Sequence, residues 1–279
     1  MIFVLFAILC SVTVSINLKL FKRYYTNAYQ AIVFNYPTAA LLCFYFFKPS
    51  FSTIPTINNW LLFFVMALLM LSIFYFISKS ISTSGIVLTA IAQRLSLVIP
   101  VLAAFLIFNE DLSSIKIIGL GVGLLAICAS VPSGKFKSGN IKFWYPVIVF
   151  TGTGVLDILF NMITKLKEIS FTTALFYIFS IATILGFVSL FKVRKSKFQL
   201  KSVLAGIILG VFNFGSIYFY IKALHLESHR PSVIFSALDI GVIALGSLVG
   251  VILFKEKLSQ FNKLGLVLAI IAICILTFS

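Results

Sequence analysis

The sequence has few charged residues and very few acidic ones. Only 10% of its 279 residues are charged, and 22 lysines and arginines outnumber seven aspartates and glutamates, for a net charge of +15. Soluble domains carry about 25% charged residues, so this composition excludes an ordinary soluble protein. The basic residues stand in short runs between apolar stretches. This arrangement is typical of a cytoplasmic membrane surface and argues against a nucleic-acid partner.

Cysteine and histidine are equally scarce. The four cysteines stand singly in apolar runs, at positions 10, 43, 128 and 274, without the spacing of a metal site. The two histidines are His225 and His229, and Glu227 stands two residues after the first. A zinc protease requires the glutamate directly after the first histidine. No nucleotide-binding motif is present either. We therefore expect no metal, no cofactor and no enzymatic activity.

Long apolar runs dominate the sequence, which is 61% hydrophobic. Crossing the hydrocarbon core of a bilayer takes about 20 mostly apolar residues. Ten stretches qualify: 2–20, 28–47, 59–78, 85–108, 114–131, 143–163, 171–191, 201–222, 231–254 and 260–278. The first stretch lacks a basic leader and a cleavage site, so we expect it to remain as a span. The sequence predicts an all-α integral membrane protein with ten transmembrane helices.

The two halves of the chain resemble each other at an offset near 145 residues. The motif Phe-x-Glu-x-Leu-Ser occurs at 108–113 and again at 254–259, and residues 108–130 match 254–276 at 9 of 23 positions. The halves are thus 1–133 and 134–279, with five helices each. Because five is odd, the second half inserts upside down relative to the first. Inverted repeats are typical of secondary transporters, whose substrate site lies near the midplane between the repeats.

Weaker matches extend the repeat toward the start of each half. Tyr-Phe at 75–76 and Lys79 correspond to Tyr-Phe at 218–219 and Lys222, at an offset of 143. Phe-Lys at 47–48 corresponds to Phe-Lys at 191–192, at an offset of 144. Small differences in loop length account for the changing offset.

Each half ends with the glutamate motif followed by a Gly-Leu pair, and the preceding helix opens at Gly85 or Pro231. These features resemble the EamA-type family of the drug/metabolite transporter superfamily. The resemblance extends over essentially the whole chain. It implies ten helices, alternating access, and export of small metabolites or amphiphilic compounds. It does not imply a particular substrate.

The basic residues also bear on orientation. Loops after odd-numbered spans carry fifteen lysines and arginines, and loops after even-numbered spans carry six. Because basic loops stay in the cytoplasm, the count predicts that both termini lie outside. The family resemblance implies termini inside, so the two indications conflict.

Three charged residues lie far from the ends of predicted spans, namely Arg94, Asp157 and Asp239. From the helix rise, they lie about 13, 21 and 18 Å from the same membrane face, in or next to the middle third of a core about 30 Å thick. A charge at this depth costs about 2.5–3.5 kcal/mol, so each needs a partner or a water-filled cavity. We expect Arg94 to pair with Asp239 or Asp157 across the two halves. Such a pair could hold a substrate carboxylate or couple a proton, or it could be a structural contact that fixes helix register.

Other candidate residues come from their depth in the spans and from the repeat. Gln93 aligns with Asp239. Uncharged polar residues at similar depth are Asn35, Tyr36, Ser72, Tyr75, Asn213 and Tyr218. We expect them to line a cavity, although contact between helices explains each one equally well. Pro100 and Gly246 occupy aligned positions and form a candidate hinge. The repeated Glu110 and Glu256 are expected at helix ends or between the halves.

These features together predict a secondary active transporter of small metabolites, exporting amino-acid-like or amphiphilic compounds by alternating access. Its partners are the lipid bilayer and a small-molecule substrate, with proton coupling, and two fused halves can work as a monomer. The expected location is the bacterial cytoplasmic (inner) membrane. The alternative is a passive channel or a non-transporting membrane assembly protein.

Overall fold

The computed structural model describes residues 2–52, 54–96, 98–99, 102, 114–130, 144–192, 198–226, 231–256, 258 and 260–278. Within these ranges the chain is helical and forms no strand. The first half contains α1 (Ile2–Arg23), α2 (Ala28–Phe47), α3 (Ile57–Ser84), α4 (Ile86–Leu95) and α6 (Ser114–Ser130). The second half contains α7 (Trp144–Thr164), α8 (Phe171–Lys192), α9 (Leu200–Leu226), α10 (Pro231–Ile252) and α11 (Gln260–Phe278).

Local sequence explains where several helices begin. The side chain of Asn27 accepts hydrogen bonds from the backbone N–H groups of Tyr29 and Gln30, which caps α2. Thr56 caps α3 in the same way. Gly85 separates α3 from α4 with a φ of 96°, a conformation that glycine adopts without steric cost.

Two helices extend further than the apolar pattern predicts. α3 continues to Ser84 and α9 to Leu226, so Lys79, which directly follows the predicted span 59–78, lies on a helix. The reason is that polar residues do not end a helix unless a breaker follows, and the first breaker after Lys79 is Gly85. α4, in contrast, covers only the first part of the span predicted at 85–108, and residues 103–108 lie outside the described residues.

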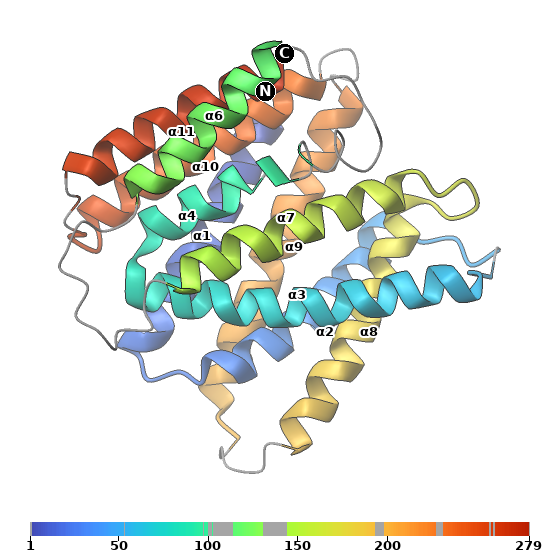
Figure 1. Ribbon diagram of the computed structural model, residues 1–279. Coiled ribbons are helices and arrows are strands. Elements are labelled where there is room, and N and C mark those ends of the chain that lie inside the picture. The colour runs from blue at the N-terminus through green and yellow to red at the C-terminus, as the bar shows by residue number, and fades with distance from the viewer. Residues whose placement is uncertain are drawn as a thin grey trace.

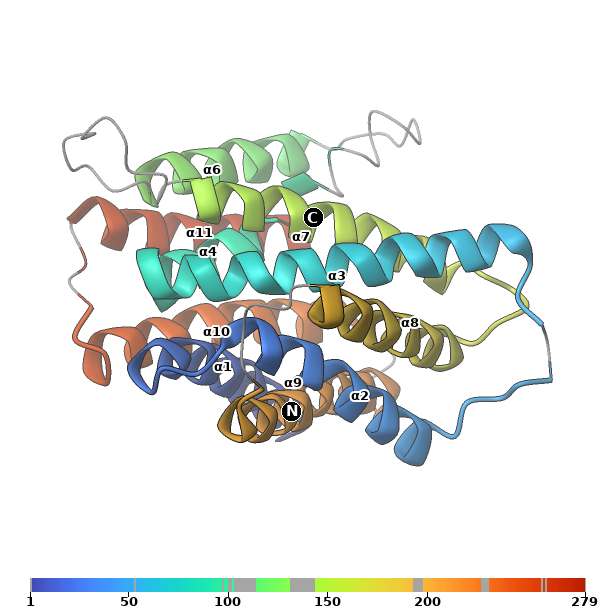
Figure 2. The same ribbon diagram turned by 90° about the horizontal axis from the view of Figure 1, so that it is seen from below.

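The helices pack into one bundle in which the two halves are interleaved (Figure 1). α2 contacts both α8 and α9, and α4 contacts both α7 and α10. α6 packs along α11, far from it in sequence, and Figure 2 shows this pair toward one side of the bundle with α2 and α9 on the other. α9 approaches α2 closely through small residues: Gly206 and Gly210 of α9 face the backbone of α2, where an added Cβ would lie 2.5 Å from the carbonyl oxygen of Ala31 and 2.7 Å from that of Asn35.

The outside of the bundle is apolar, whereas several polar residues are inside. Leu41, Leu61 and Ile184 are 71%, 62% and 63% exposed, while Asn35 is fully buried and Asp239 is 2% exposed. A soluble protein does not expose so much apolar surface. Among the described residues, six helices (α1, α2, α3, α7, α8 and α9) are long and apolar enough to cross a membrane. The chain therefore has the features of a multi-pass helical membrane protein.

Candidate functional site: an ion pair between the halves

Arg94 of α4 and Asp239 of α10 form an ion pair inside the bundle. The Nη1 of Arg94 lies 2.6 Å from Oδ1 of Asp239. The side chain of Asp239 is 3% exposed and that of Arg94 is 24% exposed. Such a short contact between a guanidinium and a carboxylate is a charge-assisted hydrogen bond. Of the two partners that the sequence left open for Arg94, the structure brings Asp239 into contact.

Asp157 of α7 lies beside this pair and has a different partner. Its Oδ2 accepts a hydrogen bond of 3.0 Å from the hydroxyl of Ser96, which directly follows α4. The same hydroxyl lies 2.6 Å from the backbone carbonyl oxygen of Gln93, so one hydrogen serves two acceptors. Asp157 also interacts electrostatically with Asp239 and Arg94. Three ionisable groups from α4, α7 and α10 thus gather in one place.

Tyr220 of α9 extends this charged cluster. It interacts electrostatically with both Asp239 and Arg94. The sequence analysis missed Tyr220 and Ser96. Nothing in their spacing distinguishes them from other hydroxyl residues in apolar helices, since only the packing of α4, α7, α9 and α10 brings them to the charged residues.

The candidates on α2 and α9 form a separate polar contact. The Nδ2 of Asn213 donates a hydrogen bond of 3.2 Å to Oδ1 of Asn35. Both Asn35 and Tyr36 are fully buried, and neither Nδ2 of Asn35 nor the hydroxyl of Tyr36 has a hydrogen-bond partner in the described part of the chain. The ring of Tyr36 packs against Phe74 of α3 and Phe179 of α8.

The remaining candidates lie in two further places. Ser72 and Tyr75 of α3 line a groove against α8. Tyr218 of α9 belongs to an aromatic cluster at the end of α2, where Phe46 and Phe47 pack on its ring with centroids 5.2 and 5.7 Å away. The predicted midplane residues therefore divide into the charged cluster, the Asn35–Asn213 contact, and two aromatic regions.

The hinge proposal concerns Pro100 and Gly246. Pro100 lies outside the described residues. α10 runs without interruption through Gly246, which packs against α4, and a Cβ added there would lie 3.8 Å from the Cβ of Ala90. This is an ordinary van der Waals contact, so the position tolerates a side chain.

The repeated glutamate of the second half contacts the first half. Oε1 of Glu256 accepts a hydrogen bond of 2.8 Å from the backbone N–H of Ile86, and Oε2 one of 3.3 Å from that of Val87. These N–H groups belong to the first turn of α4, where a helix favours negative charge. Gly85 leaves room for the carboxylate, because an added Cβ would lie 2.6 Å from Oε2. Glu110, the repeat-related residue, lies outside the described residues.

Lys19 of α1 completes this contact. Its Nζ lies 3.1 Å from Oε1 of Glu256 and donates a 3.0 Å hydrogen bond to the backbone carbonyl oxygen of Ile81, near the end of α3. One lysine therefore supplies positive charge to the end of α3 and binds the glutamate at the start of α4. Nothing in the sequence around Lys19 predicts this role, because its partners lie far away along the chain.

Comparison with known proteins places the chain among relatives of unestablished function. No family model matches it. A solved crystal structure covers 98% of this chain and 97% of its own, with a TM-score of 0.57 at 12% identity, a likeness that shows the fold alone. An uncharacterized protein of Haemophilus influenzae is 39% identical over 284 residues, covering 96% of this chain and 95% of its own length. The chain therefore belongs to the same family as this Haemophilus influenzae protein.

Proposed function

We propose that the chain is a secondary transporter of small metabolites, with ten membrane-spanning helices arranged as two inverted five-helix repeats, as in the EamA-type transporters that its sequence resembles. The charged cluster around Arg94 and Asp239 lies on its transport pathway. Export across a bacterial inner membrane, driven by a proton gradient or by exchange, is the corresponding activity.

The helix contacts support two related halves. The repeat relates α1 to α7, α2 to α8, α3 to α9, α4 to α10 and α6 to α11. Contacts between unlike helices then come in related pairs, since α1 packs on α9 as α7 packs on α3, and α1 packs on α10 as α7 packs on α4. Three further contacts join repeat mates directly: α2 with α8, α4 with α10, and α6 with α11. A pseudo-twofold axis produces this pattern.

The observation that carries the proposal is the Arg94–Asp239 ion pair. It joins α4 to its repeat mate α10, at the interface where inverted-repeat transporters bind substrate. Charges in membrane helices are costly and commonly mark substrate or proton pathways. Asp157 is a second carboxylate nearby, so Arg94 can change its partner from Asp239 to Asp157, or a proton can pass between the two aspartates, during a transport cycle.

The test uses purified protein in liposomes with an imposed pH gradient. Uptake of pooled amino acids, nucleobases and cationic dyes is measured for the wild type, for Arg94→Gln and for Asp239→Asn. The matched control is Lys22→Gln, which removes an exposed charge at the end of α1. We expect gradient-dependent accumulation that both site variants lose and the control keeps.

Two other results would contradict the proposal. Equilibration without accumulation, independent of the gradient, would identify a passive pathway. Unchanged accumulation in a folded, inserted Arg94→Gln variant would reduce the ion pair to a structural contact. Circular dichroism and size-exclusion profiles of each variant check that it is folded before it is assayed.

A further inference from the structure

A groove between α3 and α8 is a second place where polar and aromatic residues meet. Its volume is about 390 Å³, within the range of about 300–1,000 Å³ typical of small-molecule sites. Its principal lining residues are Tyr29, Leu68, Ser72, Tyr75, Leu185 and Ser189. We call this the α3–α8 groove.

The groove is lined mostly by apolar residues, and its hydroxyl groups gather toward one end, here called the polar end. At the polar end, the hydroxyls of Tyr29 and Ser189 are hydrogen-bonded to each other, and the rings of Tyr29 and Tyr75 meet edge to face with centroids 6.1 Å apart. Leu68 precedes Tyr75 by seven residues on α3, which places it about 10 Å away along the helix. Leu185 lies at the same apolar end, one helical turn before Ser189.

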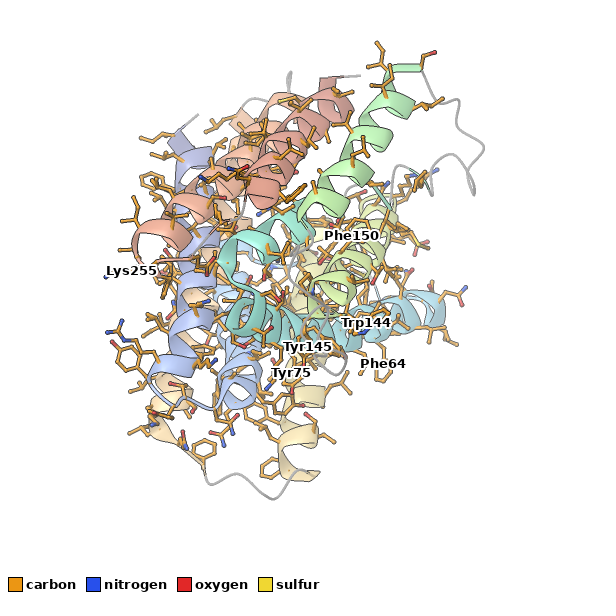
Figure 3. All side chains as sticks on the ribbon, turned by 60° about the vertical axis from the view of Figure 1, so that its left-hand side comes forward. Phe64, Tyr75, Trp144, Tyr145, Phe150 and Lys255 are labelled. Atoms are coloured by element: carbon orange, nitrogen blue, oxygen red, sulfur yellow. The ribbon has the colours of Figure 1, made fainter. Side chains whose placement is uncertain are left out.

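A cation, Lys79, stands beside the polar end, next to the lining residue Tyr75 but not itself among the lining residues. Nζ of Lys79 lies 5.4 Å from the ring centroid of Tyr75, one helical turn earlier on α3. Lys79 forms no ion pair with any residue that the structure describes. The principal lining residues include no carboxylate. An ammonium group that lies over an aromatic ring and has no carboxylate partner in the described part of the chain favours an anionic group, which it can bind through charge-assisted hydrogen bonds. In Figure 3, Tyr75 lies on the same side of the bundle as Tyr145 of α7.

The repeat-related region of the second half is filled by protein. There Lys222 lies 5.0 Å from the ring of Tyr218, as Lys79 does from Tyr75. Phe47 of α2 packs on the Tyr218 ring, however, with a centroid distance of 5.7 Å. Its counterpart on α8, Phe191, is 78% exposed. The two halves thus repeat the lysine and tyrosine, but only the first leaves the space beside them open.

We infer that the α3–α8 groove binds a small anionic amphiphile, a carboxylate with a short alkyl or aryl body. Lys79 binds the carboxylate beside the hydrogen-bonded hydroxyls of Tyr29 and Ser189, and the apolar body lies against Leu68 and Leu185. The inference rests on the proposed function in one respect, because it takes this amphiphile to be the class of substrate that the proposed transporter carries. A volume of about 390 Å³ suits one small molecule rather than a two-chain phospholipid.

The experiment is equilibrium dialysis of labelled 4-phenylbutyrate against the protein in phosphatidylcholine nanodiscs, with empty nanodiscs to subtract partitioning into lipid. The neutral alcohol and the ammonium compound with the same carbon skeleton are measured alongside. We expect the carboxylate to bind at least about tenfold more tightly than the alcohol or the ammonium compound, because only the carboxylate can form a charge-assisted contact with Lys79.

The variants test each part of the groove. Lys79→Gln should weaken 4-phenylbutyrate binding about tenfold, and Lys79→Arg should restore most of it, since either cation can bind a carboxylate. Ser72→Phe, at a position exposed in the groove, should abolish binding by filling the space. Lys222→Gln is the matched control and should bind like the wild type.

Three results would overturn the inference. The first is equal binding of 4-phenylbutyrate by Lys79→Gln and the wild type, and the second is tighter binding of the ammonium compound than of the carboxylate. The third is one phospholipid molecule per protein that copurifies with the wild type and is absent from Ser72→Phe. Dialysis involves no gradient and no transport, so the two proposals fail separately. Specific binding without transport would contradict the transporter and leave the site. Transport without binding in the groove would contradict the groove site and leave the transporter.

Discussion

Replacing Glu256 should destabilise the fold by an amount that the structure allows us to work out. The carboxylate accepts two backbone hydrogen bonds from the first turn of α4 and pairs with Lys19. Losing a capping side chain costs about 0.5–2 kcal/mol. Losing the negative charge at a helix start costs about 0.3–1 kcal/mol. Losing a partly exposed ion pair costs about 0.2–1 kcal/mol. Glu256→Ala should therefore lower the free energy of unfolding by about 1–4 kcal/mol.

Glu256→Gln separates the charge from the hydrogen bonds. The amide oxygen still accepts one backbone N–H, so this variant should lose about 1 kcal/mol, mainly the two charge terms. Lys19→Met in the Glu256→Ala background should cost less than in the wild type, because the ion pair is already absent. A double-mutant cycle measures that difference.

The assay is unfolding of the purified protein by sodium dodecyl sulfate in mixed micelles, followed by circular dichroism. The matched control is Lys255→Ala, because Lys255 is the neighbouring residue, is exposed and points away from the bundle (Figure 3). A Glu256→Ala cost within about 0.5 kcal/mol of this control would refute the capping role, since a lost cap alone costs at least that much. Equal costs for Ala and Gln would refute the part assigned to charge.

Two further predictions concern glycines. Gly85→Ala should destabilise the protein by about 1–2 kcal/mol or more, because its φ of 96° is strained for alanine and its Cβ would meet the Glu256 carboxylate. The same unfolding assay in a Glu256→Ala background should show a smaller penalty, and an unchanged one would count against the clash. Gly210→Leu should separate α9 from α2, since even a Cβ would lie 2.6 Å from that of Thr38, and should lower the yield of folded protein. Gly246→Ala serves as its control and should fold normally, as measured by size-exclusion chromatography.

The sequence predicted the helical membrane character because composition alone decides it. A chain with long apolar runs and few charges cannot form a soluble surface, whatever its tertiary arrangement. The need of Arg94, Asp157 and Asp239 for polar partners also followed from sequence, because the cost of a charge in hydrocarbon depends on depth rather than on neighbours. The end of α3 was placed too early, since hydropathy marks the apolar part of a helix and not its last residue.

What only the tertiary structure decided is which groups meet. Arg94 pairs with Asp239, while Asp157 accepts a hydrogen bond from Ser96, because the rotation of α4 against α7 and α10 selects the contacts. Lys19 and Glu256 are 237 residues apart, so no local pattern could join them. Likewise, the repeat aligns Tyr75 and Lys79 with Tyr218 and Lys222, but only side-chain packing fills the space beside Tyr218 and leaves that beside Tyr75 open. Composition and periodicity fix the environment that each residue requires, and the packing of helices distant in sequence determines which neighbour provides it.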